Sequence, residues 1–455
     1  MSTVLTSRLP PGPKPRYPLA HLFAFRKDSI GFLKNLAEQY GDIAHFTIGP
    51  LRIVLLNHPD YIREVLTTQQ SAFIKGRPLQ MVRSLLGEGL LTSEGEVHKK
   101  QSRLIQPAFH RNMLDGYAPG IVRNIQHTLA DWRDGQLVEM KEAMTEMSIA
   151  IAGSALFGVD VHQSVPEINR ALETATGLFG RIPLPFAEHL LKLPLPGTRR
   201  FLSAKARLDH ILRKMIAERE KGNNDNGDLV SLLLRASRET GDEGMSRQQV
   251  RDEAITLFLT AFDTTSTALT WTWYLLSQHA GAEAALHREL DTVLQGRLPV
   301  AADLPNLKYT RMVFGESLRL YPPSYLVPRQ AAQWVTIGGY SFPAGTIVLI
   351  SPYLIHHDAR FRANPETFDP VAWGQHAQGQ RAKYEYFPFS RGPRSCIGEP
   401  FAWMQGVLVL ATIASQWRLR MMPGHPVALQ PLINLRPRYG MKMILEKRQP
   451  SHVGG

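Results

Sequence analysis

Apolar residues recur with a helical spacing along most of the chain, with polar residues between them. This pattern predicts helices over residues 27–40, 58–68, 96–107, 117–133, 138–157, 164–180, 199–221, 228–238, 246–279, 281–295, 306–320 and 399–416. Shorter β-rich runs predict strands at 42–56, at 335–350 with a Gly-Gly turn, and near the carboxyl terminus. We therefore expect a mainly α protein with a small β region, in the α+β class.

Residues 246–279 are predicted to form an unusually long helix. Ser246 is a suitable N-cap, and the stretch RDEAITLFLTAFDTTSTALTWTWYLLSQ contains neither Pro nor Gly. Its apolar residues lie on most sides of the helix rather than on one face. We expect this helix to run through the core.

The length of 455 residues allows two or three domains or one large domain, so length alone does not decide. We expect a single domain over residues 1–455, with a Pro-rich segment at 1–20. No internal repeat or low-complexity linker divides the chain, and the polar run KGNNDNGD (221–228) is typical of a surface loop. Hydrophobic residues make up 44% of the chain, which is ample for a large core. The single cysteine, Cys396, excludes an internal disulfide and a zinc site built from several thiolates.

The net charge and the first residues bear on location and partners. The stretch MSTVLTSRLPPGPKPRYP lacks the apolar core of a signal peptide, and no run of about 18 apolar residues follows it. We expect a soluble, cytoplasmic protein without a transmembrane segment. The formal net charge is +12, but the basic residues are scattered, unlike those of nucleic-acid modules. An acidic protein partner is therefore favoured over nucleic acid.

The loop around Cys396 carries the clearest candidate chemistry. Its sequence, YFPFSRGPRSCIGEPFAWMQG, sets the cysteine among glycines and prolines, just before a helix that Pro400 suits. The helix N-terminus, Arg391 and Arg394 are expected to lower the pKa of the thiol. On these grounds alone Cys396 is a nucleophile, a metal ligand or an inert small hydrophobic residue.

The spacing of Phe389, Gly392, Arg394, Cys396 and Gly398 resembles the loop F-x-x-G-x-R-x-C-x-G of the cytochrome P450 superfamily, the haem-thiolate monooxygenases. The resemblance implies the P450 fold, with haem b between the long helix and this loop. It implies that Cys396 is the axial thiolate and metal ligand, and that Arg394 pairs with a haem propionate. It also implies that Phe389 shields the sulfur and that the glycines permit close backbone approach.

Further segments resemble family motifs in the same order along the chain. The segment FGESLRLYPP carries Glu316 and Arg319, which resemble the E-x-x-R motif and imply a structural ion pair behind the haem loop. The family usually adds a downstream arginine, and PETFDPVAW places Ala372 at that position. We expect the charge network to be incomplete or to be completed by another residue.

In the long helix, TAFDTT (260–265) resembles the family's A/G-G-x-D/E-T-T. The resemblance implies that Asp263 and Thr264 are the acid–alcohol pair that relays protons to dioxygen; a solvated helix face is the alternative interpretation. Thr260 and Ala261 replace smaller residues, and Ala261 stands where glycine normally leaves room for dioxygen. Oxygen affinity or coupling could therefore differ.

Two basic residues outside the cysteine loop resemble further propionate donors. His98, in EGEVHKKQSRLIQPAFH, stands where many members carry Trp or His, and Arg329, in LVPRQ, matches a propionate-binding arginine. Ser102 occupies a position where a basic residue is common, and the adjacent Arg103 points elsewhere on an ideal helix. We expect His98 and Arg329 to join Arg394 at the propionates.

The same resemblance implies a pocket built from separated segments, whose residues are chiefly apolar. Its candidate residues are Leu90, Phe179, Phe186, Leu257, Thr260, Ala261, Leu326, Val327 and Ile433. A lipophilic substrate such as a terpenoid or fatty acid is expected, because its burial supplies binding free energy. A packing role remains the alternative for each single residue. The apolar, Pro-rich run 180–197 is expected to gate entry or to rest on a membrane surface, with core packing as the alternative.

No segment resembles a flavin or iron–sulfur domain, and no G-x-G-x-x-G follows a strand. Electrons, ultimately from NAD(P)H, are therefore expected through a ferredoxin or flavodoxin with its reductase. Lys99, Lys100 and Arg391 are expected on the face nearest the sulfur, where an acidic partner could dock. Any solvated basic surface would have the same sequence signature.

The leading interpretation is a soluble, bacterial-type haem-thiolate monooxygenase that uses O2 to hydroxylate or epoxidise a lipophilic molecule. Alternatives on the same scaffold are a peroxide-driven peroxygenase and a non-catalytic haem sensor or carrier. The presence of Asp263 and Thr264 favours the monooxygenase. A cysteine hydrolase would need a histidine beside Cys396 and would leave the long helix and the Glu316–Arg319 pair unexplained.

Overall fold

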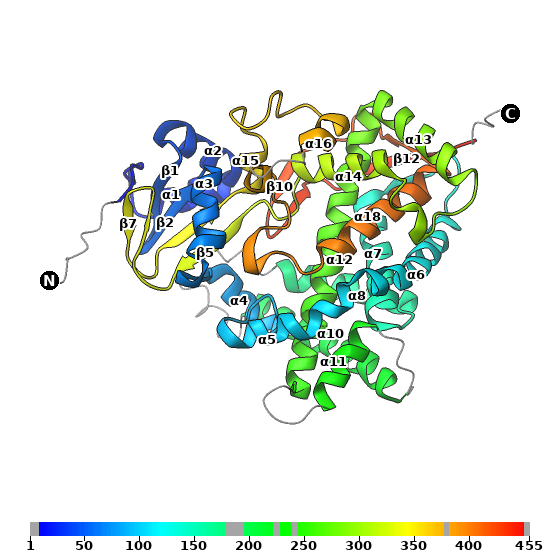
Figure 1. Ribbon diagram of the computed structural model, residues 1–455, viewed down its shortest axis with the longest axis horizontal. Helices are drawn as coiled ribbons and strands as arrows, with labels where there is room; N and C mark the ends of the chain where they lie inside the picture. Colours follow the sequence, from blue (N-terminus) through cyan, green and yellow to red (C-terminus); the bar gives the residue numbers. More distant parts are fainter. Residues whose placement is uncertain (1–8, 178–194, 222–227, 239–243, 377–381, 450–455) are drawn as a thin grey trace.

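The computed structural model describes residues 9–177, 195–221, 228–238, 244–376 and 382–449 (Figure 1). Its helices are α1 (Ala20–Lys27), α2 (Ser29–Tyr40), α3 (Pro59–Arg63), α4 (Arg77–Leu86), α5 (Gly95–Ile105), α6 (Arg111–Leu129), α7 (Met140–Phe157), α8 (Val165–Gly177), α10 (Pro196–Lys221), α11 (Leu229–Arg238), α12 (Arg247–Gln278), α13 (Ala280–Leu294), α14 (Lys308–Leu320), α15 (Pro352–His356), α16 (Pro370–His376), α17 (Ala382–Glu385) and α18 (Glu399–Ala414). Its strands are β1 (Ile43–Ile48), β2 (Leu51–Leu56), β3 (Phe73–Lys75), β4 (Leu137–Glu139), β5 (Val327–Ala331), β6 (Val335–Ile337), β7 (Tyr340–Phe342), β8 (Ile347–Ile350), β9 (Trp417–Met421), β10 (Leu429–Pro431), β11 (Leu435–Pro437) and β12 (Lys442–Lys447). The mainly helical α+β prediction is confirmed.

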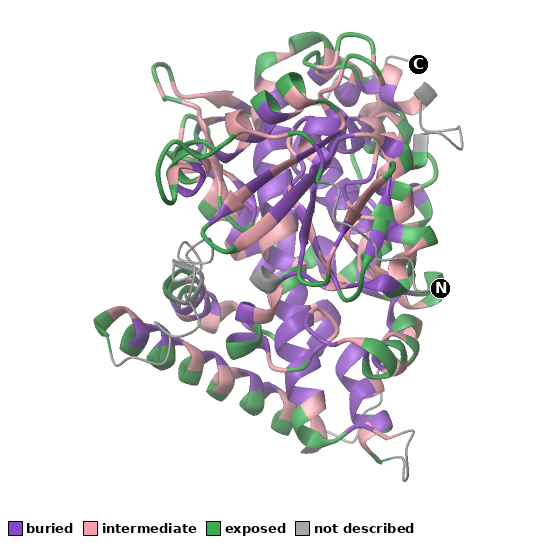
Figure 2. Cartoon of the chain, turned by 90° about the vertical axis from the view of Figure 1, so that its left-hand side faces the viewer, coloured by how far each residue is buried: buried purple, intermediate pink, exposed green. Residues whose placement is uncertain are grey.

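Helix α12 runs through the middle of the helical part of the molecule, as its apolar composition predicts (Figure 1). A capping box fixes its start: the Gln249 N–H donates to Ser246 Oγ at 3.1 Å, and the Ser246 N–H donates to Gln249 Oε1 at 2.8 Å. Helices α7, α14 and α18 pack against it. Buried residues concentrate along this central region, and exposed residues lie on the outer helices and loops (Figure 2).

The largest sheet lies at the side of the molecule that carries the amino terminus (Figure 1). Its strand order is β1-β2-β8-β5-β3, with β2 and β8 parallel and the other pairs antiparallel. The predicted Gly-Gly turn is present: Gly338 and Gly339, both at positive φ, connect β6 to β7. The edge strand β3 brings the segment before α4 beside β5, and this pairing positions part of the site.

Some predicted boundaries are wrong for identifiable reasons. The single helix predicted at 27–40 is two helices, because Asp28 is extended and its side chain accepts a hydrogen bond from Gly31 N at 2.9 Å, which caps α2. The helix predicted at 117–133 begins at Arg111 and contains Pro119. Strands β3 and β5 were missed because they are short. Helix α4 was also missed, although its apolar residues recur at helical spacing. None of the helices in the described ranges is long and apolar enough to cross a membrane.

Candidate active site

The loop that carries Cys396 is held by close backbone contacts. Gly392 has φ +79°, and a Cβ on it would lie 1.9 Å from the carbonyl oxygen of Leu66. Only glycine therefore fits at this position. The Cys396 N–H donates to the Phe389 carbonyl at 2.9 Å, which closes the loop before α18. By contrast, a Cβ on Gly398 would meet only ordinary contacts, the nearest at 3.8 Å.

The Cys396 side chain is exposed, yet protein surrounds it closely enough to weaken its hydration. Burial raises the pKa of the thiol to about 11, and hydrogen bonds from the Gly398 and Glu399 N–H groups and the charge of Lys75 oppose this rise. The sequence-based expectation of a lowered pKa is therefore wrong, because it counted nearby charges and omitted desolvation. A cation bound to the sulfur would offset this rise and stabilise the thiolate.

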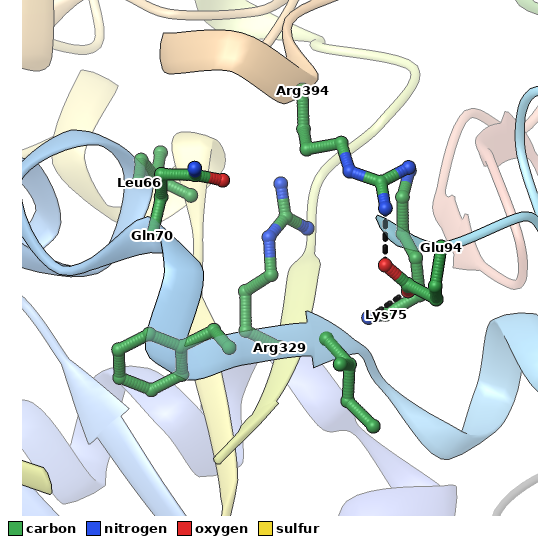
Figure 3. A pocket seen from close by; sticks show the side chains of 8 residues that line it. Leu66, Gln70, Lys75, Glu94, Arg329 and Arg394 are labelled. Carbon is green, nitrogen blue, oxygen red and sulfur yellow. Dashed lines mark hydrogen bonds and ion pairs between the residues drawn. The ribbon is translucent and has the colours of Figure 1, made fainter. Parts of the chain in front are cut away.

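A basic pocket lies beside this loop (Figure 3). It is lined by Leu66, Gln70, Phe73, Ile74, Lys75, Glu94, Arg329 and Arg394. Arg394 donates to the Ser93 carbonyl at 2.9 Å and forms an ion pair with Glu94. Glu94 also accepts a hydrogen bond from the backbone N–H of Lys75. Glu94 is thus the single acidic residue among the residues that line this pocket.

Two of the cations in the pocket stand directly opposite each other. Lys75 on β3 pairs in register with Arg329 on β5, and their side chains are 8% and 6% exposed. Burial, together with the charges of Arg329 and Arg394, lowers the pKa of Lys75 to about 7. Burial and the charge of Arg394 lower the pKa of Arg329 to about 10. Like charges at opposed strand positions destabilise a sheet, so this arrangement favours an anionic ligand.

His98, on α5, belongs to the same electrostatic group. It is 9% exposed, and burial with the charges of Arg394 and Lys75 lowers its pKa to about 4. It is therefore neutral at physiological pH and offers one N–H donor. Ser102 is half-buried and Arg103 is exposed on the same helix.

These residues fit haem. Lys75, Arg329 and Arg394 carry three potential positive charges against one negative charge on Glu94, which suits a ligand with two carboxylates. The sulfur of Cys396 supplies a soft ligand of the type that binds haem iron. Lys75 was not predicted from the sequence. The available signal was a lysine two residues after the buried Phe73, on the same side of a short strand.

Behind the cysteine loop, Glu316 and Arg319 form the predicted ion pair. Arg319 Nε and Nη2 donate to the two carboxylate oxygens of Glu316, each at 2.8 Å, and the side chains are 0% and 3% exposed. Arg362 Nη2 donates to Glu316 Oε1 at 3.0 Å. Arg362 therefore supplies the third charge that Ala372 cannot, from a position ten residues earlier in the chain. The sequence analysis missed this residue because its spacing differs from the motif.

The acid and the alcohol on α12 face different partners. The Thr264 hydroxyl donates to the Thr260 carbonyl at 2.9 Å. The Asp263 carboxylate accepts hydrogen bonds from Asn434 Nδ2 at 2.6 Å and from Arg436 Nη2 at 2.7 Å, and Lys141 Nζ lies 3.5 Å away. Asp263 is therefore held by protein groups, and the alternative of a merely solvated helix face does not describe it.

The candidate pocket residues separate into groups. Leu257, Leu90 and Ala261 pack in the core cluster of the helices, and Thr260 is exposed. Val327 and Leu326 pack instead against the large sheet. Ile433 is 47% exposed beside the equally exposed Leu432. Phe179, Phe186 and most of the run 180–197 lie outside the described residues.

The proposed docking residues have different environments. Lys99 is exposed and forms an ion pair with Glu96 at 2.7 Å, which offsets its charge. Lys100 donates to the Gly244 carbonyl at 2.6 Å. Arg391 donates to the carbonyls of Lys383 and Tyr386 at 2.9 and 3.0 Å. Because a carbonyl does not neutralise a charge, Arg391 retains its positive potential beside the loop.

Comparisons with known proteins agree with this arrangement. The Cytochrome P450 family model matches residues 10–441. Cyclooctatin synthase of Streptomyces melanosporofaciens is 35% identical, over 95% of this chain and 94% of its own. Cyclooctat-9-en-7-ol 5-monooxygenase of the same organism is 36% identical, over 89% and 88%. Pentalenene oxygenase of Streptomyces avermitilis is 31% identical, over 90% and 92%.

Among solved structures, the haem domain of cytochrome P450DA matches with a TM-score of 0.86 and 23% identity, over 98% of this chain and 99% of that one. This likeness supports the fold. The family match and the relatives above 30% identity cover nearly all of the chain, and together they show that it belongs to the cytochrome P450 family and is a haem-dependent monooxygenase that uses O2.

Proposed function

We propose that this monooxygenase oxidises a cyclic terpenoid, either a hydrocarbon or a partly oxidised alcohol. The observation that carries the proposal is the similarity, over most of the chain, to three enzymes named for cyclooctatin, cyclooctat-9-en-7-ol and pentalenene. The apolar residues Leu257 and Ala261 on α12, and Leu90 beside that helix, suit a substrate that binds by burial of hydrocarbon surface.

Different residues of the site would bind the iron, bind the propionates and transfer protons. Cys396 would bind the haem iron, and Arg394, Arg329, Lys75 and His98 would bind the propionates. Haem with a thiolate ligand supplies the activation of dioxygen. Thr264 and Asp263 then hold and move protons on the side of α12, where Asn434, Arg436 and Lys141 hold the Asp263 carboxylate.

The electrons would come from NAD(P)H through a ferredoxin or flavodoxin and its reductase. The positive charge of Arg391, which donates to two carbonyls near the cysteine loop, supports an acidic partner. A peroxide-driven reaction is the rival on the same site. The Asp263–Thr264 pair favours the use of dioxygen, since protons must then be delivered in order.

The Cys396→Ser variant tests the ligand assignment. The ferrous protein with carbon monoxide should lose the absorption band typical of a thiolate ligand, because a serine hydroxyl donates far less electron density to iron. The wild-type protein is the control, and both samples are normalised to bound haem. An unchanged band in the variant would show that another residue is the ligand.

The substrate class is tested separately with the wild-type protein. Cyclic terpenoid hydrocarbons and alcohols, linear fatty acids and polar aromatic compounds are titrated while the haem spectrum is followed. The terpenoids should give the largest spectral shifts at the lowest concentrations. Tighter binding of fatty acids than of any terpenoid would overturn the proposed substrate, without affecting the assignment of Cys396.

A further inference from the structure

Two adjacent acidic residues near the start of α12 hold the backbone of a neighbouring segment, but they differ in how fully they are partnered. Asp252 accepts hydrogen bonds from the Glu88 N–H at 2.9 Å and from Arg251 Nη1 at 2.8 Å, so both of its oxygens are used. Glu253 accepts at Oε2 from the Leu90 N–H at 2.9 Å. Its Oε1 has no hydrogen-bond partner among the described residues, although Glu253 is 0% exposed.

A second unpaired group lies one helical turn further along α12. Thr256 is 2% exposed, and its hydroxyl has no hydrogen-bond partner within the described ranges. By contrast, the buried hydroxyl of Thr270 on the same helix donates to the Ser266 carbonyl at 2.7 Å. Residues three apart on a helix are neighbours, so the Thr256 hydroxyl and the Glu253 carboxyl can reach one ligand atom. Because an unpaired buried polar group costs free energy, two of them side by side favour a polar ligand at this place.

The backbone of residues 88–90 packs directly against this part of α12. A Cβ on Gly89 would lie 2.5 Å from the Asp252 carbonyl oxygen and would also clash with Thr256 Oγ1. Only glycine therefore allows the segment to come so close to the helix. Residues 88–90 thus close the site around Glu253 and Thr256 on one side.

The two unpaired groups lie on the same face of α12 as the proposed proton relay. Thr264 follows Glu253 by eleven residues, which is close to three full helical turns, so both residues lie on one side of the helix. Between them on this side stand Leu257, which is buried, and Thr260, which is exposed. Thr256 precedes Thr264 by eight residues, or about 12 Å along the helix axis. A substrate that lies along this face can therefore reach both ends of it.

The surroundings of Glu253 favour a neutral carboxyl group. Burial raises the pKa of Glu253 to about 8; the hydrogen bond from the Leu90 N–H opposes this rise, and the charge of Asp252 adds to it. At neutral pH Glu253 therefore holds a proton and offers an O–H donor. A neutral acid beside a threonine hydroxyl suits a neutral oxygen-containing group rather than an ion. An alcohol fits both partners, since its hydroxyl can donate one hydrogen bond and accept others.

We propose that Glu253 and Thr256 bind a hydroxyl group already present on the substrate, and that they select a terpenoid alcohol over the parent hydrocarbon. This inference rests on the proposed terpenoid substrate and decides between its two forms. The substrate hydroxyl accepts a hydrogen bond from the Glu253 carboxyl and donates to Thr256 Oγ1. The carbon that is oxidised lies near Thr264, about 12 Å along α12 from the bound hydroxyl. The enzyme therefore acts after a reaction that installs the first hydroxyl group.

The test compares cyclic terpenoid alcohols with the hydrocarbons that lack only the hydroxyl group, each titrated against the holoenzyme while the haem spectrum is followed. The wild-type protein should bind its preferred alcohol about tenfold more tightly than the matching hydrocarbon, because the hydrocarbon leaves both groups unpaired. Thr256→Val and Glu253→Met should lose this preference, mainly through weaker binding of the alcohol. Glu253→Gln keeps an acceptor for the Leu90 N–H and a donor for the ligand, so it should retain most of the preference.

Thr270→Val is the matched control, because it removes a buried hydroxyl of α12 that already has a partner within the helix. It should keep the preference for the alcohol. An equal preference in wild type, Thr256→Val and Glu253→Met would overturn this inference and leave the terpenoid substrate in place. If fatty acids bind more tightly than every terpenoid, the substrate class fails and this inference fails with it.

Infrared difference spectroscopy of the holoenzyme gives a readout that does not depend on affinity. The C=O stretching band of a protonated carboxyl group is assigned to Glu253 by its loss in Glu253→Gln. This band should shift when the alcohol is added and should stay in place when the hydrocarbon is added. A band that the alcohol leaves unchanged would show that the hydroxyl group binds elsewhere, and would overturn the inference.

Discussion

Two groups of buried charges lie on either side of the cysteine loop, and they are built in opposite ways. In the group behind the loop, Glu316 accepts from Arg319, from Arg362 and from the Asp369 N–H at 3.1 Å, and Arg319 also donates to three carbonyls. In the basic pocket, Lys75 faces Arg329 across two strands with only Glu94 as an acidic neighbour. In the first group the charged side chains find their hydrogen-bond and ion-pair partners within the protein. In the second group the cations outnumber their acidic partner.

This difference distinguishes a structural network from a binding site. A buried charge costs free energy unless it is paired and hydrogen-bonded. Buried charges that stabilise the fold are therefore expected to have partners within the protein. A surplus of one sign persists where a ligand of the opposite sign offsets it. Both groups contain more cations than acids, but in the first each arginine binds the carboxylate of Glu316, whereas in the second Lys75 and Arg329 stand opposite each other.

The largest effect is expected when the carboxylate of Glu316 is removed from the group behind the cysteine loop. Glu316→Gln removes the carboxylate that Arg319 and Arg362 share, and the loss of one partner from a buried pair costs about 3–5 kcal/mol of unfolding free energy. Urea unfolding of the haem-containing protein measures this change. Glu96→Gln, which breaks the exposed pair with Lys99, is the matched control and should change stability by under about 1 kcal/mol. Equal effects of the two substitutions would remove the distinction between the groups.

In the basic pocket, by contrast, loss of a charged side chain should weaken haem binding without lowering the stability of the haem-free protein. Lys75→Met removes a cation that is repelled by Arg329 and Arg394. We expect about tenfold faster transfer of haem to an acceptor apoprotein, equivalent to roughly 1.4 kcal/mol of binding free energy. The unfolding free energy of the haem-free protein should stay the same or rise. If haem transfer stays at the wild-type rate, Lys75 does not contact the propionates.

The pH dependence of the haem-free protein sharpens this contrast. The pKa of Lys75 is about 7 in the folded chain, well below the ordinary lysine value of 10.5. Between these pH values the unfolded chain binds a proton that the folded chain lacks, so the unfolding free energy rises with pH. Wild type should therefore gain stability relative to Lys75→Met from pH 7 to pH 9. If the unfolding free energies of wild type and Lys75→Met changed with pH in parallel, the pKa of Lys75 would not be lowered by its neighbours.

The smallest effect concerns the surface. Lys99→Glu should slow the first reduction by an acidic ferredoxin only a few-fold at low salt, because Glu96 already offsets part of the Lys99 charge. Salt near 0.1 M, where the screening length is about 10 Å, should reduce the difference. Lys214→Glu, on α10, is the control and should reduce normally. Equal slowing in both variants would show a general effect of net charge rather than a docking face.

The sequence predicted local parts of this molecule well. The cysteine loop and the Glu316–Arg319 pair lie within short segments, where spacing along the chain determines spacing in the structure. Lys75, Arg362 and Lys141 escaped prediction because their partners come from distant segments, which only the tertiary fold brings together. The thiol pKa was misjudged for a related reason: charges can be read from a sequence, but the burial that outweighs them cannot.

The position of Arg362 also bears on recombination between relatives. A crossover placed between Arg362 and Ala372 could join this chain to one that carries an arginine at the motif position. One hybrid would then have two arginines competing for Glu316, and the reciprocal hybrid would have none. Crossovers outside residues 358–372 keep the arginine together with the backbone around Asp369 that orients Glu316. In chimaeric libraries of this family, crossover points are therefore best chosen so that residues in contact come from the same parent, rather than by the alignment of motifs.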